Sequence, residues 1–103
     1  MERGATANLI FEFEREMRRE DVAAIRLYAL GARSGAKVTK TEEDMVFGEG
    51  GRILVRFAQE ETLGFADNED VRFQWHWRDA DGEVFVSAVE ELCVYEFLGG
   101  GAI

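Results

Sequence analysis

The stretch VRFQWHWR, residues 71–78, decides the fold because apolar and polar side chains alternate along it without a break. Successive side chains of an extended strand point to opposite faces of a sheet. One face would carry Val71, Phe73, Trp75 and Trp77, and the other would carry the polar residues between them. The pattern predicts a half-buried β-strand with both tryptophans in the core and His76 facing solvent.

The polar segment that follows predicts a tight turn and a second strand. Asp79-Ala80-Asp81-Gly82 combines side chains that accept backbone hydrogen bonds with a glycine that tolerates positive φ. If all of these residues form the turn, Trp77 pairs with Val84 and Arg78 with Glu83. This register places Val84 and Val86 on the core side of a hairpin that runs from Val71 to Val89.

Period-two patterns also mark the middle and the end of the chain. Val38–Phe47 and Arg52–Ala58 read as strands, and Gly48–Gly51 predicts the hairpin turn between them. In the second of these strands Ile53, Val55 and Phe57 share one face. Leu92–Leu98 is predicted to be the last strand, with a short helix over Glu90–Leu98 as the alternative.

The N-terminal part predicts helix. Between Asn8 and Gly31, apolar residues recur at about one-turn spacing, at Ile10, Phe13, Met17, Ala24 and Tyr28. A break near Glu20 would divide the segment into two helices, the second starting at Val22 and running to Ala32 or Arg33. The alternative makes Leu9–Glu14 a strand, because Phe11 and Phe13 alternate there with glutamates.

The expected fold is therefore α+β, with an N-terminal helix, or two helices, packed on a four- to five-stranded antiparallel meander. Residues 1–98 would form a single domain, followed by a flexible glycine-rich tail at 99–103. In element order alone, this arrangement resembles cystatin-like and NTF2-like folds. That resemblance implies a cone-shaped ligand-binding domain or small enzyme, with a pocket between helix and sheet lined by Trp75, Trp77, Tyr28 and Phe57.

Charge is distributed unevenly along the sequence. The net charge is -9, yet Met1–Ala58 is balanced, and the whole excess falls in Gln59–Ile103, whose only bases are Arg72 and Arg78. Such an excess attracts cationic partners and repels nucleic acid and anionic membranes. The alternative is an acidic surface that only aids solubility. The acids expected to bind a partner are Glu60, Glu61, Asp67, Glu69, Asp70, Asp79, Asp81, Glu83, Glu90 and Glu91.

No motif in the sequence identifies a reaction. His76 and Cys93 are the only histidine and cysteine, and neither has a recognisable partner for general-base or nucleophilic catalysis. Asp79-x-Asp81-Gly82-Glu83 lacks the remaining ligands of a calcium loop of about twelve residues. We therefore expect a non-enzymatic protein without cofactor or metal. A single cysteine and no apolar leader favour the cytoplasm, and ten arginines against two lysines favour a bacterial or phage source.

These observations favour a small acidic binding protein of the inhibitor, immunity or phage anti-defence type. Its partner would present a basic surface, for example that of a nucleic-acid-handling protein, and the sequence leaves a homodimer open. A remote alternative comes from Leu98-Gly99-Gly100, which resembles the C-terminus of ubiquitin-like proteins and implies a modifier activated at the two glycines.

Overall fold

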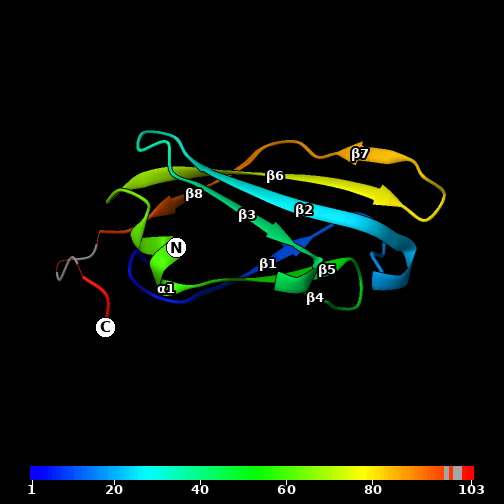
Figure 1. Ribbon diagram of the computed structural model, residues 1–103, viewed down its shortest axis with the longest axis horizontal. Coiled ribbons are helices and arrows are strands. Elements are labelled where there is room, and N and C mark those ends of the chain that lie inside the picture. Colours follow the sequence, from blue (N-terminus) through cyan, green and yellow to red (C-terminus); the bar gives the residue numbers. More distant parts are fainter. Residues whose placement is uncertain (97, 99–100) are drawn as a thin grey trace.

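Two antiparallel β-sheets pack face to face in the computed structural model, which describes residues 1–96, 98 and 101–103 (Figure 1). The smaller sheet has the strand order β1-β5-β4, and the larger has the order β3-β2-β6-β7, with β8 also paired to β6. In chain order the strands are β1 (Ala7–Glu12), β2 (Val22–Gly31), β3 (Lys37–Thr41), β4 (Met45–Phe47), β5 (Arg52–Phe57), β6 (Glu69–Asp79), β7 (Val84–Val86) and β8 (Glu90–Val94).

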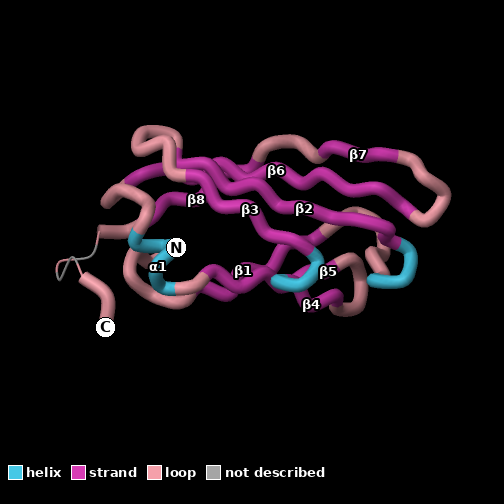
Figure 2. Tube along the Cα trace, viewed as in Figure 1, coloured by secondary structure: helices cyan, strands magenta, loops and turns pink. Residues whose placement is uncertain are grey.

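The predicted N-terminal helices are wrong, and the fold is β-rich rather than α+β. The helical elements of the described residues are three short turns, η1 (Arg19–Asp21), η2 (Glu42–Asp44) and α1 (Gln59–Leu63) (Figure 2). The segment expected to begin the helix forms β1, as the alternative strand reading of Leu9–Glu14 had it. Without a long helix, the expected pocket between helix and sheet does not form either.

The second predicted helix, from Val22, is instead β2, a central strand of the larger sheet between β3 and β6. Alanine, leucine and arginine give this segment a high helix propensity, but propensity is a weak prior that tertiary contacts override. Its apolar residues also fit a period of two, since Ile25, Leu27 and Ala29 are fully buried and the residues between them face outward. Pairing on both sides satisfies the strand's backbone groups.

The core lies between the two sheets and confirms the predicted burial of both tryptophans. On β6, Trp75 is 3% exposed and Trp77 is 9% exposed, while His76 faces solvent. Ile53, Val55 and Phe57 of β5 are fully buried on the facing sheet. The hairpin between β4 and β5 also forms as expected.

The hairpin after β6 forms in a register that differs by one residue from the predicted one. Val84 pairs with Arg78, and Phe85 pairs with Trp77. The reason is that Asp79 belongs to the strand: its N–H donates to the Glu83 carbonyl, and its Oδ1 accepts the N–H groups of Asp81 and Glu83. A shift of the pairing register by one residue moves every side chain of the strand to the opposite face of the sheet. Val84 and Val86 are therefore exposed, and Phe85 stacks on Trp77 with 5.2 Å between the ring centres.

This register predicts unequal effects of two neighbouring truncations. Phe85→Ala should lower the free energy of unfolding by about 2 kcal/mol, because it removes a half-buried ring from Trp77. Val84→Ala should change it by no more than about 0.5 kcal/mol, because that side chain lies in solvent. Urea unfolding of both variants measures the difference, and a larger loss for Val84→Ala would contradict the observed register.

Two other predicted strands differ from those observed. Val38–Phe47 is divided by η2 into β3 and β4, which belong to different sheets. The last strand is Glu90–Val94 rather than Leu92–Leu98, and Phe97 lies outside the described residues. Gly99 and Gly100, on which the expected tail and the ubiquitin-like alternative depend, also lie outside them. A single domain ending at residue 98 stays a prediction.

Candidate functional site

The charge separation seen along the sequence is not a separation in space. Bases from the balanced first half of the chain contact acids of the second half around α1. Arg3 Nη1 lies 3.5 Å from Asp67 Oδ1, and Lys40 Nζ lies 2.5 Å from Glu61 Oε1. The acids between residues 60 and 70 therefore form part of a mixed-charge region.

Glu61 is held on two sides. Its Oε1 also accepts the N–H of Ala58 at the start of α1, at 2.8 Å. Lys40 points inward from β3, is 6% exposed, and places its Nζ 5.1 Å from the centre of the Phe57 ring. This half-buried ion pair connects α1 to the larger sheet.

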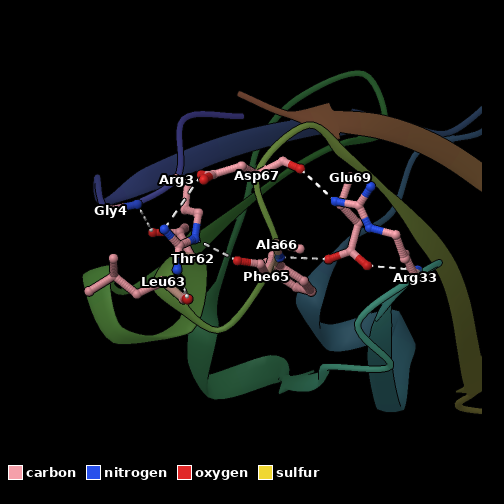
Figure 3. Close-up of polar contacts among 9 residues, drawn as sticks. All are labelled: Arg3, Gly4, Arg33, Thr62, Leu63, Phe65, Ala66, Asp67 and Glu69. Carbon is pink, nitrogen blue, oxygen red and sulfur yellow. Dashed lines mark hydrogen bonds and ion pairs between the residues drawn. The ribbon is translucent and has the colours of Figure 1, made fainter. Parts of the chain in front are cut away.

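Glu69 is buried, so it does not belong to an exposed acidic surface. At the first position of β6 it is 2% exposed and accepts hydrogen bonds from Arg33 N at 2.7 Å and Ala66 N at 2.8 Å (Figure 3). It also accepts from Ser34 Oγ at 2.8 Å and from Ser34 N. Burial by itself raises the pKa of this carboxyl, but the backbone N–H groups of Ser34 and Ala66, the Ser34 hydroxyl and the Arg33 N–H lower it to about 2. The carboxylate joins the β2–β3 turn to the loop before β6.

Arg3 holds the other side of that loop. Its Nε donates to the Phe65 carbonyl at 2.6 Å, just after α1, and its Nη2 donates to the carbonyl of Leu63, the last residue of α1, at 3.1 Å (Figure 3). Cationic groups at this position satisfy carbonyls that a helix end leaves without partners. Arg3, Asp67 and Glu69 thus take part in holding the fold.

The other predicted partner-binding acids do not form one patch. Glu60 lies on α1, Asp70 faces outward at the start of β6, and Glu91 of β8 pairs with Arg72 at 3.3 Å. Asp79, Asp81 and Glu83 lie at the β6–β7 turn, at the opposite end of a molecule 46 Å long (Figure 1). Whether these residues bind a partner stays a prediction.

The outer face of the larger sheet carries bases in a chain that is acidic overall. Strand pairing places Arg26 opposite His76, while Arg72, Arg78 and Lys37 point to the same side. Tyr28 also lies there, with Lys37 Nζ 5.6 Å from its ring centre. Tyr28 therefore does not line a pocket with Trp75, Trp77 and Phe57, which face the core.

Two adjoining hollows lie at the open side of the sandwich, of ≈ 460 Å³ and ≈ 270 Å³, and they share Arg15 and Trp77. We call the two hollows together the trough. Its acids are Glu12, Glu14, Glu16, Asp21, Asp79, Asp81 and Glu90, its bases are Arg15 and Arg18, and its other lining residues are Phe11, Phe13, Met17, Val22, Trp75, Trp77, Ala80, Ser87 and Ala88. Three of the predicted acids line the trough: Asp79 and Asp81 line the smaller hollow, and Glu90 lines the larger one.

Aromatic rings in edge-to-face and stacked contact form the wall of the trough. The ring centre of Phe13 lies 5.1 Å from that of Trp75 and 5.6 Å from that of Trp77, and the Trp77 ring stacks on Phe85. The guanidinium of Arg15 lies over this wall, 4.5 Å from the Phe85 ring centre and 5.8 Å from that of Trp77. The trough thus combines an aromatic surface, a cation resting on it and a rim of carboxylates.

Sequence reasoning missed the N-terminal contribution to this site. Glu12, Glu14 and Glu16 belong to a half whose charges balance along the chain, and the helix reading gave them no common place. The signal that could have found them is the alternation of Phe11 and Phe13 with glutamates. In a strand reading, this alternation separates an apolar face from an acidic one.

The two reactive side chains singled out in the sequence lie outside the trough. His76 is exposed and lies opposite Arg26 and Val86 in the sheet. Cys93 is half-buried on β8, with its Sγ 3.7 Å from the Val94 carbonyl oxygen. Within the part of the chain that the structure describes, no three side chains of the metal-ligating types gather as a metal site would need, and no helix is long and apolar enough to cross a bilayer.

Comparison with protein-family models, with curated proteins and with solved structures finds no match to this chain.

Proposed function

We propose that this chain is a non-enzymatic binding protein of the inhibitor or immunity type, a class that includes phage anti-defence proteins. Its trough would receive a basic segment on the surface of a larger partner, such as a nucleic-acid-handling protein, in the cytoplasm. The partner would be cationic, as the composition predicts. It would contact the trough rather than the acids around α1, several of which are used within the fold.

The position of Arg15 carries this proposal. Its guanidinium lies within cation–π distance of both Phe85 and Trp77, so the aromatic wall already holds a cation of this chain at the protein surface. A cation over an aromatic face gains about 0.5–2 kcal/mol, more where water is excluded. A partner's arginine placed along the same wall would gain a similar contact.

The carboxylates around the wall add charge selectivity. Glu14, Asp81 and Glu90 are exposed trough residues for which the described part of the chain shows no ion pair. Exposed charges of this kind mainly speed the encounter with an oppositely charged partner and exclude partners of like charge. Their effect should weaken as salt screens it.

The test measures binding of a capped peptide of about seven residues that alternates arginine and valine, and of its glutamate counterpart. Both tryptophans of the chain line the trough, so their fluorescence reports binding. The arginine peptide should bind, and its affinity should fall steeply between about 50 and 300 mM salt. The combined change Glu14→Gln, Asp81→Asn and Glu90→Gln should weaken its binding about tenfold.

A matched control separates the trough from net charge. Glu43→Gln, Glu49→Gln and Glu60→Gln together remove the same charge from exposed positions outside the trough. This control should leave affinity within about threefold of the parent chain. Equal losses in the two variants, or equal binding of the arginine and glutamate peptides, would contradict the proposed function.

A further inference from the structure

The two sheets differ in width at the open side of the sandwich. The larger sheet continues past β6 to β7 and β8, whereas the smaller sheet ends at β1. Since η2 joins β3 directly to β4, those two strands lie at the closed side of the sandwich. Strand β1 lies under β6, because the ring centre of Phe11 lies 5.5 Å from that of Phe73 and 5.2 Å from that of Trp75. The strands β7 and β8 therefore extend beyond the last strand of the smaller sheet.

The chain itself covers the two ends of this overhang. Arg15 lies against Phe85 of β7, and the N-terminal residues reach the end of β8, where Met1 N donates to the Cys93 carbonyl at 2.8 Å. Between these ends residues 87–89 leave the regular ladder, and the Ser87 hydroxyl accepts the Trp75 N–H at 2.9 Å in place of a backbone carbonyl. Ser87 and Ala88 of this segment line the larger hollow of the trough.

The other border of that hollow is a free strand edge. β1 has six residues, and among the residues that the structure describes it pairs with β5 on one side only. In an edge strand, every second residue directs its backbone N–H and C=O away from the sheet, where they can pair with an added strand. Residues at the end of β1 and just after it, Phe11–Arg15, line the hollow.

We propose that the partner's basic segment binds as an extended strand along the free edge of β1, adding a fourth strand to the smaller sheet beneath the overhang. Its backbone would bond to β1, and every second side chain would point at the wall formed by Trp75 and Trp77. The acids Glu14 and Glu90 beside the hollow select basic residues in that strand, whereas Glu12 already pairs with Arg52 of β5 at 3.2 Å. This inference rests on the proposed function and specifies how the trough is used.

A second copy of this chain fits the edge poorly. Paired antiparallel through β1, each copy would bring its own β7–β8 overhang into the space above the other copy's β1. The edge strand also carries an acid and no base, and Glu14 follows it closely. A separate basic segment has neither the overhang nor the like charge.

The test uses the arginine–valine peptide and two versions of it, N-methylated at the valines in one and at a matching number of arginines in the other. Only one alternate set of N–H groups of an added strand faces β1. One methylated version should therefore bind at least about tenfold more weakly than the unmethylated peptide, and the other should stay within about threefold. The protein is unchanged throughout, so no variant needs to fold.

The remaining outcomes distinguish failure of the edge pairing from failure of the proposed function. If both methylated versions bind like the unmethylated peptide, or if both lose affinity equally, edge pairing is overturned. The proposed function then still stands, because the unmethylated peptide binds and the trough acids govern its affinity. If the unmethylated arginine peptide binds no better than the glutamate peptide, the proposed function itself fails, and this inference fails with it.

Discussion

Replacing Glu69 with glutamine should lower the free energy of unfolding by about 3–5 kcal/mol. The carboxylate accepts hydrogen bonds from Arg33 N, Ser34 N, Ser34 Oγ and Ala66 N in a site that is 2% exposed. Glutamine keeps the shape but brings an NH₂ group toward groups that are themselves donors, and buried donors without an acceptor are costly. The β2–β3 turn and the loop before β6 should loosen together.

Asp70→Asn provides the matched control for this change. Asp70 is the next residue of β6, carries the same charge and is exposed on the outer face of the sheet. Its replacement should change stability by no more than about 0.5 kcal/mol. Urea unfolding of both variants tests the contrast, and equal losses would show that the hydrogen-bond network around Glu69 contributes little.

The same carboxylate predicts how stability depends on pH. Its pKa falls from the ordinary value of 4.5 to about 2 in the folded state, so folding favours the charged form. This contribution, about 3 kcal/mol, is fully present above the unfolded-state pKa and is lost as the pH falls toward about 2. The stability difference between the parent chain and Glu69→Gln should therefore shrink over that range. A difference independent of pH would contradict the charged, hydrogen-bonded state of Glu69.

How far the sequence predicts the fold depends on how strictly the apolar residues alternate. Strand β6 alternates without interruption and was recognised with its buried tryptophans, and so was β5. The sequence of strand β2 predicts helix because its residues are strong helix formers, and its period-two pattern is interrupted between Val22 and Ala24, where the pairing register shifts. Nothing local reveals that this segment pairs on both sides in the larger sheet.

The candidate site shows a similar limit. Asp79, Asp81 and Glu90 were among the acids predicted to bind a partner, but their association with Glu12, Glu14 and Glu16 depends on how the two sheets pack. The buried role of Glu69 depends on donors from two separate loops. Sums of charge along a chain cannot distinguish an acid used inside the fold from one left at the surface, since both count equally in composition.

Gly51→Ala should destabilise the protein by about 3 kcal/mol or more and should also disturb the trough. Gly51 has φ 78°, a conformation that costs an L-residue roughly 1–2 kcal/mol. A Cβ at this position would lie 2.6 Å from the Phe13 carbonyl oxygen and closer still to that of Arg15. Both contacts are with backbone, so the segment that carries Phe13 and Arg15 would have to move away from the β4–β5 hairpin.

A substitution at the neighbouring Gly50 distinguishes the effect of this close contact from the effect of backbone strain alone. Gly50 has φ 68° in the same turn, but a Cβ there would meet nothing within 4 Å. Gly50→Ala should therefore cost only about 1 kcal/mol. Gly51 also accepts the Phe13 N–H at 2.9 Å, a bond that a displaced segment would lose. Only Gly51→Ala should change tryptophan fluorescence and weaken binding of the arginine peptide, because it moves Phe13 against Trp75 and Trp77. Equal effects of the two substitutions on stability and on fluorescence would mean that the close approach of Gly51 does not position the wall of the trough.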